Sequence, residues 1–179
     1  MDLFTLIRKR PSIRAHVERN VEEAKLTALL DSIRATPSAG NLQASGVIVV
    51  RDPESKRALA RAAVERTFFA QAPVVPVFHL DPDRSARFHG RRGRSLYPLQ
   101  DAAIACTHAH LAATAPGPGS CWAGALTEDA VRAILKPPEP MTPVAPARPC
   151  DVGSILKTPP QLSRRASRAA RDAGVFRYP

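Results

Sequence analysis

One stretch constrains the fold of this chain more than any other. Residues 100–115 form the strongest helical pattern in the sequence, and apolar or small side chains occupy nearly every face of it. Such a helix has no polar face to present to water, and its small residues let neighbouring elements approach closely. The sequence therefore predicts a buried central helix around which the other elements pack.

Shorter segments on either side alternate between helical and extended patterns. Helices are expected at residues 3–10, 21–34, 52–64 and 127–135, and strands at residues 47–50 and 72–78. Pro76 lacks an N–H, which favours an edge position or a bulge for the second strand. Residues 81–95 are polar and predict a mobile connection. At 179 residues, the chain is long enough for one domain with a real core, spanning 1–179.

The chain is strongly basic, with 26 Lys and Arg against 16 Asp and Glu and a formal charge of +10. Such a charge could attract nucleic acid, an anionic membrane or a phosphorylated ligand. Much of the excess lies in residues 87–94 and 164–171, and clusters of this kind are more often solvated faces than binding sites. The few aromatic side chains of the sequence do not interleave with these clusters as a base-stacking surface would, so a nucleic-acid partner is the least favoured interpretation.

Cysteines and histidines suggest neither a disulfide framework nor a metal site. Cys106, Cys121 and Cys150 are odd in number and widely separated, while His108 and His110 point to different faces of a helix. We expect satisfied or solvent-facing histidines and reduced cysteines, as in a cytoplasmic protein. No window approaches the roughly 20 apolar residues that span a bilayer, so no membrane association is expected.

A sharp polar turn is predicted at residues 37–43, between a helix and a strand. Pro37 cannot continue a helix, Gly40 permits positive φ, and Ser38 and Asn41 offer side-chain hydrogen bonds that compete with the backbone. On local chemistry alone, a plain helix-to-strand connection explains this segment at least as well.

A second polar segment follows the first helix. Arg10, Ser12 and Arg14 occupy alternate positions, so in an extended segment all three project from one side. Guanidinium forks suit phosphate or an anionic ring edge, and the serine adds a neutral donor. The spacing is a weak signal by itself, because a solvated basic turn has the same composition.

These two segments and a third occur in one order that is far more specific than any of them alone. Arg10-Pro11-Ser12-Ile13-Arg14, Pro37-Ser38-Ala39-Gly40-Asn41-Leu42-Gln43 and Gly119-Ser120-Cys121-Trp122-Ala123-Gly124 closely resemble motifs of the FMN-dependent nitroreductase family. The resemblance covers roughly residues 3–143. It implies an α+β fold, in which a mainly antiparallel sheet is flanked by helices and the buried helix lies at the centre.

The resemblance also implies a flavin site shared between the subunits of a homodimer. Arg10 and Ser12 would hold the FMN phosphate and ribityl chain, and Arg14 would lie near the flavin N1. The turn at residues 37–43 would approach the flavin across the dimer interface, and backbone N–H groups of the third motif would point to N5 and O4. The expected cofactor-binding residues are Arg10, Pro11, Ser12, Arg14, Ser38, Asn41, Gln43, Trp122, Ala123 and Gly124.

By the same resemblance, NADH or NADPH would reduce FMN, and a nitroaromatic, quinone or similar small acceptor would then be reduced in a ping-pong cycle. The cofactor would supply the chemistry, so no catalytic side chain and no metal ligand is assigned.

Departures from the family pattern motivate an alternative. Ala44-Ser45 replace the usual Pro-Trp, Pro118 stands where Leu is usual, and prolines crowd residues 137–149. Beyond residue 143 the pattern fades, and residues 144–179 are expected to be an irregular basic segment, in which Arg164 and Arg165 could reach the FMN phosphate. The alternative is therefore a catalytically impaired flavin-binding or interaction protein on the same scaffold.

Overall fold

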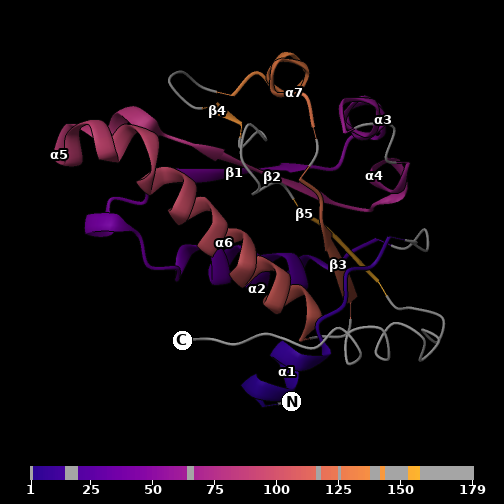
Figure 1. The fold of residues 1–179 in the computed structure, drawn as a ribbon. Helices are drawn as coiled ribbons and strands as arrows, with labels where there is room; N and C mark the ends of the chain where they lie inside the picture. The colour runs from indigo at the N-terminus through magenta and orange to yellow at the C-terminus, as the bar shows by residue number, and fades with distance from the viewer. Residues whose placement is uncertain are drawn as a thin grey trace, which may run out of the picture.

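The predicted central helix is present as α6 (Tyr97–Thr114), which crosses the middle of the molecule (Figure 1). The computed structural model describes residues 2–14, 20–63, 67–115, 118–124, 126–137, 142–143 and 153–157. Its other helices are α1 (Leu3–Lys9), α2 (Glu23–Arg34), the 3-10 turn η1 (Ala39–Asn41), α3 (Pro53–Ala62), α4 (Phe68–Gln71), α5 (Pro82–Ser95) and α7 (Glu128–Leu135). Its strands are β1 (Ser45–Val50), β2 (Val75–Leu80), β3 (Pro118–Trp122), β4 (Thr142–Pro143) and β5 (Gly153–Lys157).

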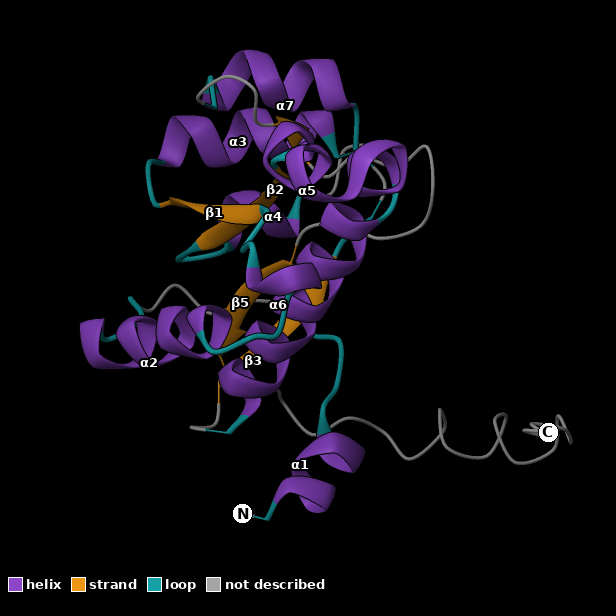
Figure 2. Cartoon of the chain, turned by 90° about the vertical axis from the view of Figure 1, so that its left-hand side faces the viewer, coloured by secondary structure: helices purple, strands orange, loops and turns teal. Residues whose placement is uncertain are grey.

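Two small antiparallel sheets organise these strands. One has the order β1-β2-β4, with Val50 opposite Val75 and Ser45 opposite Leu80. The other pairs β3 with β5. Helices lie on both sides of the first sheet, as Figures 1 and 2 show. The expected α+β class, with antiparallel strands, flanking helices and a buried central helix, is confirmed.

The apolar strands β1 and β2 supply both faces of the core, because successive side chains of a strand point to opposite sides. On one side Val50, Val75 and Val77 pack with α3, α4 and α7. On the other side Val47, Val49 and Phe78 pack with α2 and α6. In α6 the contacting residues are mostly alanines, which brings the helix axis close to the sheet. The strand predicted at residues 47–50 is therefore present, and both of its faces are packed.

Of two expectations about the segment 72–95, one holds only locally and the other is wrong. β2 lies between β1 and β4, but pairing with β4 begins at His79, so among the described strands Pro76 has a neighbour on one side only, as its missing N–H requires. The stretch 81–95 is not a loose connection but the helix α5. Asp81 caps it by accepting a hydrogen bond from Arg84 N at 2.9 Å, and a positive φ of 56° at Gly90 interrupts it.

The expectation of an irregular segment over residues 144–179 is also wrong in part. Residues 153–157 form β5, whose backbone pairs along the whole length of β3, with Ser120 opposite Ile155. An exposed strand edge offers unpaired backbone groups that a following segment can satisfy. Arg164 and Arg165 lie outside the described residues.

The first helix forms as predicted, but none of its own side chains is buried. The exposed fractions of Leu3, Phe4 and Ile7 are 59, 69 and 49%. This helix lies on the far side of α6 from the sheet (Figures 1 and 2). Across the described ranges, no helix combines the length and the apolar character that a bilayer crossing requires.

Candidate functional site

The segment of residues 10–14, which we call the N-terminal strap, lies against β3. Ile13 donates its N–H to the carbonyl of Ser120 at 2.9 Å, and Ser12 forms an isolated parallel bridge with the same residue. Gly119 makes this approach possible, because a Cβ at that position would overlap Cδ1 of the buried Ile13. The first and third sequence motifs are therefore brought together in one chain.

A buried imidazole fastens the strap to the core. Nη1 of Arg10 is 2.9 Å from Nε2 of His110 on α6, and Nδ1 of His110 hydrogen-bonds Oγ of Ser120 on β3. Burial and then the neighbouring positive charge of Arg10 lower the pKa of His110 from 6.5 to about 4. The imidazole is consequently neutral near pH 7.

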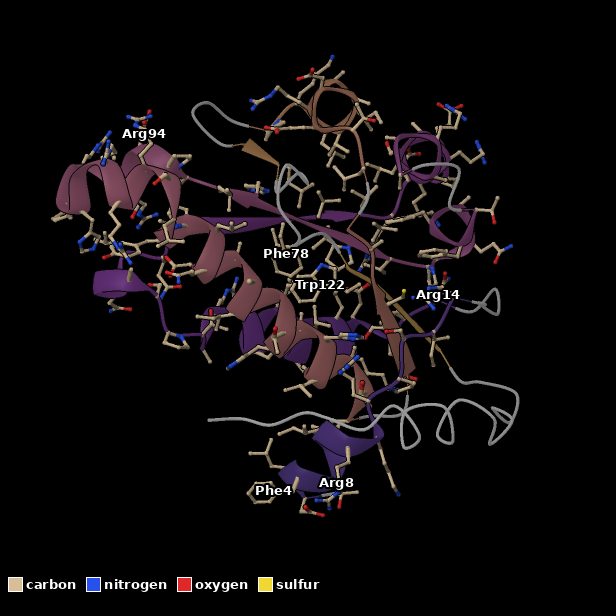
Figure 3. The ribbon with its side chains drawn as sticks, in the orientation of Figure 1. Phe4, Arg8, Arg14, Phe78, Arg94 and Trp122 are labelled. Atoms are coloured by element: carbon tan, nitrogen blue, oxygen red, sulfur yellow. The ribbon has the colours of Figure 1, made fainter. Side chains whose placement is uncertain are left out.

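The strap carries positive charge that no described side chain neutralises. Ion pairs in the described part of the chain involve neither Arg10 nor Arg14. Arg10 is half-buried, whereas Ser12 and Arg14 are exposed. Figure 3 places Arg14 beside β3, on the side of the molecule away from α5. Within the described ranges, two guanidiniums and a hydroxyl thus have no carboxylate partner, and such donors suit an anion.

The third motif continues from β3 into the core. Trp122 is half-buried and lies with Phe78 between α6 and the sheet (Figure 3). Ala123 is buried and Gly124 half-buried just after the strand ends. Residues 118–122 are extended, as the strand β3, and residues 116–117 lie outside the described ranges.

The polar turn forms as predicted and adopts positive φ at Gly40, Asn41 and Gln43, with values of 58°, 54° and 52°. Its side chains stabilise it locally: Oγ of Ser38 accepts from Gln43 N at 2.9 Å, and Oδ1 of Asn41 accepts from Gln43 Nε2 at 3.2 Å. These bonds offset the cost of left-handed backbone at residues other than glycine.

A buried carboxylate on α6 holds the turn in place. Oδ1 of Asp101 accepts a hydrogen bond from Ala39 N at 3.0 Å, while its Oδ2 is buried without a hydrogen-bond partner among the described residues. Burial raises the pKa of Asp101 above its usual value, partly opposed by the bond from Ala39 and by nearby His89. An open groove of about 560 Å³ runs beside it, lined by Pro37, Ser38, Ala39, Tyr97, Gln100, Asp101, Ala103 and Ile104.

The structure therefore divides the predicted site residues into two groups. Arg10, Pro11, Ser12, Arg14, Trp122, Ala123 and Gly124 belong to the strap and the region around β3, while Ser38, Asn41 and Gln43 belong to the turn. The strap meets α6 at His110 and the turn meets it at Asp101, which is about 14 Å away along the helix at a 1.5 Å rise per residue.

Sequence reasoning missed the residues that hold each group. His110 was expected to be a satisfied or solvent-facing histidine, and it is indeed satisfied, but its partner is Arg10 of the strap. Asp101 was treated only as part of a helical pattern. The available signal was a polar residue at a buried position of an apolar helix, because such a residue needs a partner.

The sequence profile described as the nitroreductase family matches residues 7–75 and 61–145 of the chain. An NADH dehydrogenase from Thermus thermophilus is 42% identical over 45% of this chain and 40% of its own length. A candidate NADH dehydrogenase/NAD(P)H nitroreductase from Archaeoglobus fulgidus is 30% identical, over 77% of this chain and 78% of the relative. An FMN reductase (NADPH) from Bacillus subtilis is 25% identical, over 90% of this chain and 68% of the relative. The chain thus spans less than half of the Thermus relative.

Solved structures agree with this assignment at the level of the fold. An FMN-dependent nitroreductase from Clostridium difficile R20291 superimposes with a TM-score of 0.75, over 98% of this chain and 99% of that one, at 23% identity. The profile match over most of the chain and the Archaeoglobus relative, which is 30% identical over 77% of it, show that the chain belongs to the nitroreductase family.

Proposed function

We propose that this protein is an FMN-dependent oxidoreductase that takes electrons from NADH or NADPH. The observation that carries the proposal is the unneutralised strap: Arg10 and Arg14 flank the exposed Ser12 hydroxyl and form no ion pair within the described chain. The names of the relatives, which include an FMN reductase and an NADH dehydrogenase, support the same cofactors.

The residues present fit the flavin mononucleotide. Arg10 has used one guanidinium N–H on His110, and the other N–H groups with the Ser12 hydroxyl suit a phosphate. Arg14 would place positive charge beside the flavin ring where negative charge accumulates on reduction. Backbone N–H groups at Ala123 and Gly124 would orient the ring, with Trp122 beside them.

FMN, when bound, supplies a ring that accepts two electrons from NAD(P)H and passes them on. The protein's residues bind and orient it, and we assign no side chain as a general acid or base. We propose that NAD(P)H and a small acceptor, such as a nitroaromatic or a quinone, occupy the site in turn, as a ping-pong cycle requires.

The site is completed, in this proposal, by a second copy of the chain. Two features support a homodimer. The first helix exposes Leu3, Phe4 and Ile7 without covering them, and an apolar helix face of this kind is typical of an interface. The turn residues Ser38, Asn41 and Gln43 are held beside an open groove, about 14 Å along α6 from the point where the strap is held. In a dimer, the turn of one copy would reach the strap of the other.

The visible absorption spectrum of the purified protein tests this function. We expect a flavin spectrum, release of FMN on denaturation, and bleaching when NADH or NADPH is added anaerobically. A colourless protein that takes up no added FMN would overturn the proposal. Bound FMN that neither nucleotide reduces would instead favour the catalytically impaired flavin-binding protein.

A further inference from the structure

The contact between Arg10 and His110 determines where the proton of this imidazole must lie. A guanidinium donates hydrogen bonds and accepts none, so the Nε2 atom that faces Nη1 of Arg10 at 2.9 Å must carry a lone pair. The proton is then on Nδ1, which faces Oγ of Ser120. A doubly protonated ring would set an N–H and a positive charge against the guanidinium.

The rest of the hydrogen-bond chain agrees with this tautomer. Oγ of Ser120 accepts from Nδ1–H, and its own proton is directed at the carbonyl of His110 at 3.5 Å. The carbonyl of Ser120 meanwhile accepts the N–H of Ile13 in the strap. The neutral imidazole is therefore satisfied on both nitrogens, and the strap is fastened to β3 and α6 at neighbouring points.

This arrangement has a consequence for the free donors of Arg10. A long arginine side chain in solvent samples many rotamers, and fixing it on binding costs free energy. Here one N–H is already held by a buried acceptor, so the planar guanidinium is oriented before a ligand arrives. A neutral acceptor achieves this without cancelling the positive charge, which a carboxylate at the same place would do.

We propose that His110 is a positioning residue: as the Nδ1–H tautomer it links Ser120 to Arg10 and holds the guanidinium ready for the phosphate of the flavin. This inference rests on the proposed function, because it takes Arg10 as the phosphate anchor. Arg10 is the charged group that faces His110 from the strap, and Ser120 faces it from β3.

Affinity for FMN and for riboflavin, which lacks the phosphate, separates positioning from general damage. We expect His110→Leu to weaken FMN binding roughly tenfold, as loss of a hydrogen bond to a charged group predicts, and to leave riboflavin binding unchanged. His110→Gln, which keeps one acceptor and one donor, should restore most of the difference. His108→Leu, the same change two residues away on another face of α6, should have no effect.

Equal weakening of FMN and riboflavin in His110→Leu would overturn the inference, and so would unchanged binding of both. A second readout needs no flavin. In histidine NMR spectra we expect His110 as the Nδ1–H tautomer, with a pKa that rises in Arg10→Ala because the facing charge is gone. An unchanged pKa would overturn the proposed contact. If the wild-type protein bound neither flavin while this NMR shift was present, the proposed function would have failed and not the contact.

Discussion

The two ends of α6 serve the candidate site in opposite ways. Near its C-terminal end, His110 is a neutral acceptor that holds the cationic strap against β3, and these contacts all lie within one chain. Near its start, Asp101 is a buried acid that holds the turn through Ala39, and the turn borders an open groove. The strap end joins three elements of one chain and leaves cationic donors exposed, whereas the turn end lies beside an open groove.

This difference indicates how one helix could organise the site that we propose two copies share. Both ends use a single buried polar side chain to fix a segment that has little regular structure of its own. Satisfied buried groups rigidify their surroundings, and segments held this way keep their shape before a ligand binds. Substitutions at the strap end should therefore change FMN binding, whereas substitutions at the turn end should change stability.

The largest effect is expected at the cationic end. Arg10→Ala should weaken FMN binding by about 100-fold, because a charged hydrogen-bond donor to phosphate contributes roughly 1.5 to 3 kcal/mol. Riboflavin affinity, measured by fluorescence quenching in the same preparation, should stay within about threefold, since it lacks the phosphate. Comparable losses for both ligands would remove Arg10 as the phosphate anchor.

The acidic end should respond through stability and not through phosphate binding. Asp101→Ala leaves Ala39 N–H without its acceptor, which should lower the free energy of unfolding by about 2 kcal/mol. Asp101→Asn keeps an acceptor and should cost less. Urea unfolding at one fixed protein concentration measures both. A loss in Asp101→Asn that matched the alanine variant would contradict the assigned hydrogen bond.

Lowering the pH should reduce the stability of the fold through His110, at the cationic end of α6. Because the folded-state pKa of His110 is lowered from 6.5 to about 4, the unfolded chain binds a proton first as the pH falls through this window. The contribution to stability is present above pH 6.5 and is lost toward pH 4. Wild type should therefore lose about 2 kcal/mol more than His110→Leu between pH 7 and 5. Identical pH dependence of the two proteins would refute this explanation.

The smallest change is expected where the strap touches β3. Gly119→Ala forces Ile13 to move away, which should cost about 1 kcal/mol of stability by overpacking. Gly90→Ser adds a side chain where there is space, because a Cβ at Gly90 meets no atom within 4 Å. Any loss of stability in this variant therefore comes from the positive φ, which is unfavourable for serine. Thermal unfolding compares them. If FMN binding in Gly119→Ala remained at the wild-type level, the close approach of strap and strand would matter only for stability.

Much of the architecture could be predicted from local patterns. The apolar run of α6, the turn at residues 37–43 and the strand 47–50 each have periodicity or turn chemistry that the structure preserves. Such signals are contained within a few neighbouring residues. They identify element types well, and the order of the three motifs then identified the family.

The wrong or missing predictions concern features that local composition does not determine. Polar composition suggested a loose connection at residues 81–95, but an Asp81 cap and Pro82 begin a helix there. β5 forms by pairing with the edge of β3, and no pattern within residues 153–157 predicts this pairing. The link between Arg10 and His110 joins residues 100 positions apart, so only the folded chain can reveal it.

Mixed dimers test the central claim, that strap and turn meet from two copies, most directly. One chain carries Arg10→Ala, and the other carries Asn41→Gly with Gln43→Gly, which keeps the positive φ of the turn. Each variant homodimer should bind FMN poorly, whereas the mixed dimer should recover one tight site, built from the intact strap of one copy and the intact turn of the other. The control pairs a wild-type chain with one carrying all three substitutions and should recover none. Tight binding in the control and none in the mixed dimer would show that each chain builds its own site.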